Sequence, residues 1–95
     1  KKSLRGKETV METRVALISM IVQDQESALE INALLHAYRQ YIIGRMGIPY
    51  APKKISIISI AIDAPQDIIS ALSGKLGALR GVSAKTVYSK VEGAN

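Results

Sequence analysis

An internal repeat of about 40 residues is the feature that most restricts what this chain can fold into. The segment ISMIVQ at residues 18–23 aligns with ISIAID at residues 58–63. The same offset places Ile42 on Val82 and Arg45 on Lys85, with no gap between them. Each copy has the pattern of a strand, a helix and a second strand. Two βαβ units of similar length that follow each other predict a split βαβ topology.

Local patterns support the four strands. Residues 15–22 and 55–62 are apolar runs of strand length, rich in β-branched side chains, as is typical of strands buried on both faces. Residues 41–50 and 82–88 supply the second strand of each half. We therefore predict an α+β, ferredoxin-like βαββαβ sandwich, in which two helices cover one face of a four-stranded antiparallel sheet.

The two helices follow from apolar residues at helical spacing. We expect Asp24 to cap the first helix and Pro65 to occupy the first position of the second, where a missing N–H costs nothing. Gly77 and Gly81 are suited to helix ends because glycine tolerates a positive φ. The predicted buried stripes are Ala28, Ile31, Leu34, Leu35 and Tyr38, followed by Ile68, Ile69, Leu72, Leu76 and Leu79.

Composition limits the chemistry of this chain of 95 residues, whose length indicates one domain. There is no Phe or Trp, so the core is expected to be aliphatic, and the absence of Cys excludes disulfides and thiolate metal sites. The longest apolar runs are far shorter than the ~20 residues that a membrane span needs. No signal peptide is recognisable, so we expect a cytoplasmic protein without a membrane partner.

The net charge of +5 is concentrated at the N-terminus. Residues 1–10 hold Lys1, Lys2, Arg5 and Lys7 against Glu8, so we expect a basic tail or an upstream segment there. The ferredoxin-like domain is predicted to span residues 11–90 and to be followed by a loose C-terminus at residues 91–95. The predicted central strands lack the aromatic side chains on which RNA-recognition domains stack bases. We therefore expect no specific binding of nucleic acid by this chain alone.

The predicted sheet has more apolar surface than two helices can cover. Alternation along the first and third strands gives two apolar faces, of which only one lies beneath the helices. A large exposed apolar patch usually marks an interface. We therefore predict a homo-oligomer, a dimer or a tetramer, that packs through the open face, although residues 1–10 are an alternative cover. The predicted interface residues are Val15, Leu17, Ile21, Ile55 and Ile57.

Few residues are suited to catalysis or metal binding. His36 is the only histidine, and no serine is selected as its nucleophilic partner. The acylphosphatases share this topology, but the loop after the first strand here lacks their glycine-rich, arginine-containing phosphate site. We therefore expect neither an enzyme nor a cofactor. A metal site that uses His36 across a subunit interface is the alternative.

The segment at residues 44–47 is the candidate binding site. Gly44 and Gly47 weaken a strand interior, and glycines in such positions often mark a bulge or the close approach of a ligand. Arg45 lies between them and has the fork geometry to bind a carboxylate or phosphate. We predict that Gly44, Arg45, Met46 and Gly47 bind an effector or partner. The alternative is an irregular edge strand that discourages aggregation.

Several segments resemble the iron-only hydrogenase system regulator family. They are METRV at residues 11–15, YIIGRMGIPY at residues 41–50, LSGKLG at residues 72–77 and GVSAKT at residues 81–86. The resemblance covers residues 11–90. It implies a stand-alone ferredoxin-like domain related to ACT domains and to the C-terminal domain of the nickel-responsive repressor. It also implies an association with hydrogenase systems.

Two departures restrict what the resemblance implies. The nickel-responsive repressor binds nickel through several His and a Cys, whereas this chain has one His and no Cys. ACT domains often bind amino acids through a glycine in the loop after the first strand, and residues 23–26 contain none. The sequence therefore predicts a non-catalytic regulatory domain that binds a small effector or a protein partner.

Overall fold

The computed structural model describes residues 12–90 of the chain. The tail predicted at residues 1–10 and the loose C-terminus predicted at residues 91–95 lie outside them. The elements follow one another in the predicted order, with three short 3₁₀ turns between them. They are β1 (Arg14–Val22), η1 (Gln25–Ser27), α2 (Ala28–Ala37), η2 (Arg39–Tyr41), β2 (Ile42–Tyr50), η3 (Ala51–Lys53), β3 (Ile55–Ala64), α3 (Gln66–Gly77) and β4 (Val82–Tyr88).

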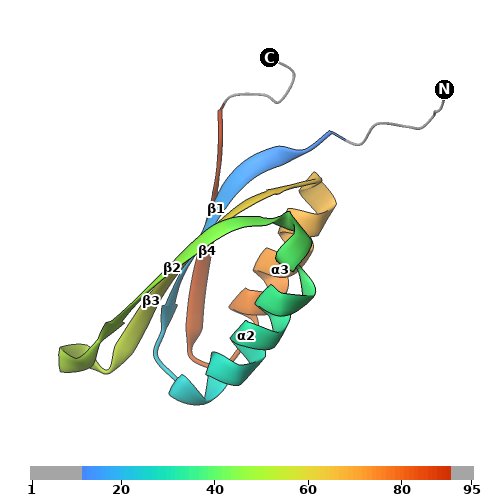
Figure 1. The fold of residues 1–95 in the computed structure, drawn as a ribbon. Helices are drawn as coiled ribbons and strands as arrows, with labels where there is room; N and C mark the ends of the chain where they lie inside the picture. The colour runs from blue at the N-terminus through green and yellow to red at the C-terminus, as the bar shows by residue number, and fades with distance from the viewer. Residues whose placement is uncertain (1–11, 91–95) are drawn as a thin grey trace, which may run out of the picture.

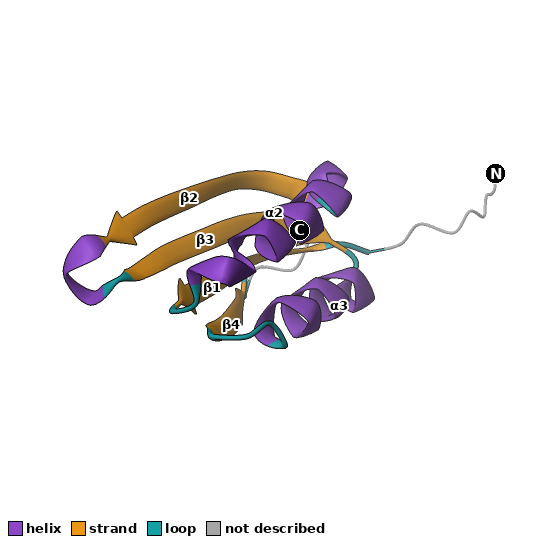
Figure 2. Cartoon of the chain, turned by 90° about the horizontal axis from the view of Figure 1, so that it is seen from below, coloured by secondary structure: helices purple, strands orange, loops and turns teal. Residues whose placement is uncertain are grey.

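The four strands form one antiparallel sheet in the order β2-β3-β1-β4. Both helices lie on the same face of this sheet, and no element within residues 12–90 covers the other face (Figure 1). The α+β ferredoxin-like prediction is therefore confirmed, with β1 and β3 as the adjacent central strands. The hairpin of β2 and β3 extends past the helices and ends in η3 (Figure 2).

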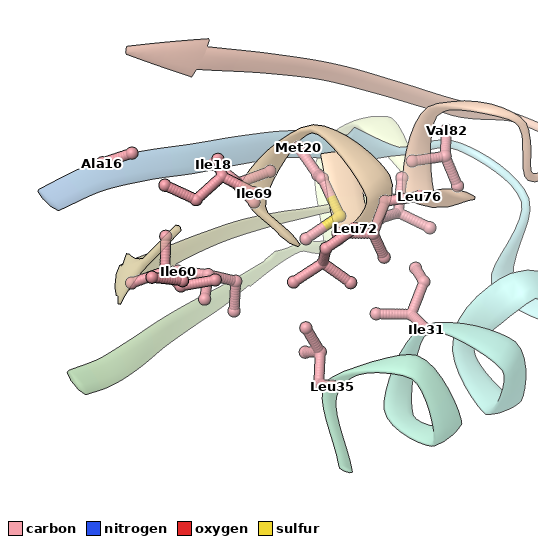
Figure 3. Close-up of a cluster of buried hydrophobic side chains, with 13 residues drawn as sticks. Ala16, Ile18, Met20, Ile31, Leu35, Ile60, Ile69, Leu72, Leu76 and Val82 are labelled. Atoms are coloured by element: carbon pink, nitrogen blue, oxygen red, sulfur yellow. The ribbon is translucent and has the colours of Figure 1, made fainter. Parts of the chain in front are cut away.

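The core lies between the helices and the covered face of the sheet. Ile18 and Met20 of β1 meet Ile60 of β3, and Ile31 and Leu72 approach them from α2 and α3 (Figure 3). All of these side chains are almost fully buried. The core contains no aromatic ring, as the composition predicts, and half-buried tyrosines pack only against its margin.

A close contact between two loops fixes the end of the sheet where both helices approach it. The Gln23 amide donates to the Gly81 carbonyl at 2.7 Å, and the buried Ser27 hydroxyl donates to the Arg80 carbonyl at 2.6 Å. Gly81 has φ +70°, and a Cβ built there would lie 2.6 Å from the Asp24 Cβ. Glycine is required at this position by both its conformation and its surroundings.

The helix starts differ in detail from those predicted. Asp24 does act as a cap, but of η1, where its Oδ1 accepts a hydrogen bond from the Glu26 amide at 2.9 Å. Pro65 was expected at the first helical position and instead lies one residue earlier, at the N-cap. Its ψ of 151° is extended rather than helical, so the chain turns into the helix only at Gln66.

A bulge at the start of β2 changes the face on which later residues lie. Ile42 pairs with Ile62, but Gly44 pairs with Ala61, so Ile43 is the extra residue. Because neighbouring residues of a strand point to opposite faces, one extra residue exchanges the two faces for the rest of the strand. Even-numbered residues of β2 after the bulge therefore lie on the open face.

We predict that Gly81→Ala lowers the free energy of unfolding by more than about 2 kcal/mol. A left-handed conformation costs an L-residue about 1–2 kcal/mol, and displacement of Asp24 adds to this. Gly74→Ala is the matched control, because Gly74 is an exposed residue inside α3 with nothing within 4 Å of its Cβ position. That variant should gain about 0.5–1 kcal/mol. Urea denaturation measures the free energy of unfolding of both variants. Equal changes in the two would contradict the conclusion that position 81 requires glycine.

Candidate functional site

The open face of the sheet gathers most of the exposed apolar side chains. Eight of the ten large apolar residues exposed within residues 12–90 lie on it, whereas Leu29 lies on α2 and Ile43 in the bulge. Leu17 is 46% exposed, and Val87 on the β4 edge is 64% exposed. The eight are Val15, Leu17, Ile21, Met46, Ile48, Tyr50, Ile57 and Val87.

Strand register arranges the middle of this face in three rows, each of which crosses β2, β3, β1 and β4 in that order. The leucine row is Gly44, Ala61, Leu17 and Val87. The serine row is Met46, Ser59, Ser19 and Lys85. The isoleucine row is Ile48, Ile57, Ile21 and Ser83. The polar row therefore lies between two apolar rows.

The centre of the open face is polar, but its hydroxyl groups have hydrogen-bond partners within the sheet. The hydroxyls of Ser19 and Ser59 lie 3.1 Å apart and hydrogen-bond to each other. Lys85, at the β4 end of the same row, is the one charged residue of the three rows. Asp63 lies beyond the leucine row, opposite Val15. The face thus presents an apolar surface with one cation near one edge.

Small residues leave room on this surface. A shallow hollow of about 570 Å³ lies at the edge where β4 approaches the end of α3. It is lined from the open face by Ser83, Ile21 and Ile57 and from the helix side by Gly77, Val82 and Ala84. At Gly44 a Cβ would meet nothing within 4 Å, and its φ is not positive. Neither the backbone conformation nor the packing within residues 12–90 requires glycine at this position.

The predicted interface residues lie together, as expected from alternation. Val15, Leu17, Ile21 and Ile57 are exposed side by side on the central strands, while Ile55 is half-buried at the start of β3. The sequence prediction omitted four members of the patch, namely Met46, Ile48, Tyr50 and Val87. Gly44 in the apparent strand is the sequence signal for a bulge. The bulge determines that Met46, Ile48 and Tyr50 lie on the open face.

The segment at residues 44–47 is divided between the two faces of β2. Gly44 and Met46 lie on the open face, whereas Arg45 and Gly47 lie on the helix side. The Arg45 guanidinium donates to Oδ1 of Asn32 on α2 at 3.3 Å. Within residues 12–90 Arg45 has no carboxylate partner, so its charge is not neutralised there. These four residues therefore do not all lie on the same face of the sheet.

His36 lies in the last turn of α2, and its ring is exposed to solvent. Its carbonyl accepts a hydrogen bond from the Arg39 guanidinium at 2.8 Å. No group of three or more His, Asp or Glu side chains comes together within residues 12–90. Helices of that region are also all too short or too polar to cross a bilayer.

Comparisons with known proteins identify relatives of this chain. The sequence model of the TM1266-like family, described as a proposed iron-only hydrogenase system regulator, matches residues 14–86. The solved structure of the uncharacterized protein TM1266 from Thermotoga maritima is similar, with a TM-score of 0.79 and 39% sequence identity. The match covers 83% of this chain and 100% of that one. No curated protein matches the sequence.

Proposed function

The chain belongs to the TM1266-like family, and on that premise we propose that it is a non-catalytic regulatory domain that acts by binding. The family description supports a regulatory role in an iron-only hydrogenase system. The observation that carries the binding function is the open face, where eight large apolar side chains are exposed and no element within residues 12–90 covers them. Patches of this kind mark interaction surfaces.

The proposed occupant of the open face is a second copy of the chain. A domain of about 95 residues has a small core, so burial of a further apolar surface contributes substantially to its stability. Apolar surface stabilises by roughly 25 cal/mol per Å² removed from water. The free edges are less suitable for association. Lys85 lies in the middle of β4, and β2 carries a bulge and Pro49, all of which discourage edge-to-edge pairing.

A second binding surface is proposed on the helix side of β2, for a small anionic effector. Arg45 offers a guanidinium whose bonded partner is the neutral amide of Asn32, so a carboxylate or phosphate would be its first charged partner within the described region. Gly47 lies on the same side, two residues along the strand, with nothing within 4 Å of its Cβ position. The open space beside Gly47 gives such a ligand room to approach the backbone.

We predict that Leu17→Asp converts the assembled protein into a folded monomer. Leu17 is half-exposed on the open face, so the substitution places a carboxylate in the proposed interface without disturbing the core. Leu29→Asp is the matched control, because Leu29 is 81% exposed on α2 at the other side of the sheet. Sedimentation equilibrium should show monomers for the first variant only. A wild-type protein that stays monomeric at high concentration would overturn the proposed assembly.

We predict that Arg45→Ala weakens the binding of small anions by about tenfold or more, because a charge-assisted hydrogen bond contributes roughly 1.5–3 kcal/mol. Succinate and inorganic phosphate are suitable probes, and ¹H–¹⁵N NMR titration reports both affinity and location. Arg39→Ala is the control, since Arg39 is also bonded to a neutral acceptor but lies beyond the end of α2. Equal affinities and equal chemical-shift changes in the wild type, Arg45→Ala and Arg39→Ala would show that Arg45 does not bind the anion.

A further inference from the structure

The three rows of the open face restrict how a second copy can cover it. A closed pair of identical subunits that pack face to face has its two-fold axis in the plane between the two sheets. Sheets that pack in the aligned way keep their strand directions within about 30° of each other. The axis then runs either parallel or perpendicular to the strands. This inference rests on the assembly proposed above and decides between these two arrangements.

An axis parallel to the strands, between β1 and β3, lays each row over the same row of the partner in reverse order. In the leucine row, Gly44 then faces the partner's Val87, and Ala61 faces the partner's Leu17. Each contact pairs a small residue with a larger one. Interfaces pack as densely as protein interiors, so such complementary sizes favour a close approach of the two sheets.

The isoleucine row follows the same pattern at its ends. Ile48 faces the partner's Ser83, which is one of the residues that line the hollow of about 570 Å³. Ile57 faces the partner's Ile21 in the middle of that row. The isoleucine on β2 therefore faces a small side chain at this hollow, which Ile21 and Ile57 also line. In the serine row, Ser59 faces the partner's Ser19, and the polar centre is shared by both sheets.

A perpendicular axis through the serine row also places small residues opposite large ones. Side-chain size alone therefore does not distinguish the two axes. It superimposes the leucine row on the partner's isoleucine row and the serine row on itself. Lys85 would then face the partner's Lys85. Like charges that face each other across an interface repel and are unfavourable. The one charged residue of the three rows therefore disfavours this arrangement.

The parallel axis gives Lys85 an apolar neighbour instead. It faces the partner's Met46, whose unbranched thioether adapts to the lysine stem. Because β4 is an edge strand, the ammonium group can still reach water past the rim of the interface. We propose that the open face is self-complementary about a two-fold axis parallel to the strands, so that β2 of each subunit covers the partner's β4 and Met46 packs on the partner's Lys85.

A charge exchange between these two positions tests the proposal. Met46 and Lys85 lie three strands apart within one subunit, about 14 Å, so they do not interact there. Met46→Lys should raise the dimer dissociation constant by about 100-fold, because it sets lysine against lysine twice. Lys85→Glu added to that variant should restore it to within about tenfold of wild type. Both sites are exposed, so thermal unfolding of the diluted monomers should be unchanged.

The alternative axis predicts a different result for the double variant. There, residue 46 faces its own copy and residue 85 faces its own copy, so Met46→Lys and the double variant each hold two like-charge pairs, and Lys85→Glu would not restore assembly. Such a result, or no effect of Met46→Lys on a wild-type dimer, would overturn the proposed axis. Neither result would affect the dependence of assembly on Leu17, so failure of the axis is distinguishable from failure of the assembly.

Crosslinking provides a second measurement that needs no charge in the interface. The chain has no cysteine, so Met46→Cys and Lys85→Cys each introduce a single thiol. A short bis-maleimide should join the two variants when they are mixed, and should join neither variant to itself. Self-crosslinking of Lys85→Cys would support the perpendicular axis and overturn the proposal. Absence of all crosslinks in a sample shown to be dimeric would also overturn the proposal.

Discussion

The antiparallel pairing of β1 with β3 is the interaction on which the rest of the structure depends. Nine residue pairs, from Arg14 with Ala64 to Val22 with Ser56, join the two strands without a shift. The pairing places one side-chain set under the helices and the other on the open face. β2 and β4 then extend the outer edges of this pair. The polar side chains of Ser19 and Ser59 make the open face the less costly one to leave in water, because they reduce its apolar area.

Much of this pairing could be predicted because the two central strands carry the same pattern 40 residues apart. The repeat gave the order of elements, and alternation gave the members of the buried face, such as Ile18 and Ile60. Polar caps and a proline located the helix starts to within a few residues. These inferences succeed because each rests on local chemistry, either the period of a strand or the hydrogen bonds at a helix end.

The face of β2 could not be predicted, because a bulge depends on how two strands pair rather than on one strand alone. The repeat aligns Arg45 with Lys85, yet Arg45 lies on the helix side and Lys85 on the open face. One extra residue at Ile43 accounts for the difference. Alternation divides the predicted site at residues 44–47 between two surfaces, and the bulge decides which two of its residues lie on the open face. Tertiary pairing, and not residue type, assigns each side chain to its surface.

This division has a consequence for regulation. Arg45 and Met46 are adjacent residues of one strand, but the first faces the proposed effector surface and the second the proposed subunit interface. An effector that changes the twist of β2 at Arg45 therefore moves Met46 and Ile48 relative to the partner. Linkage is reciprocal, so an effector that strengthens assembly must bind more tightly to the assembled protein than to the monomer.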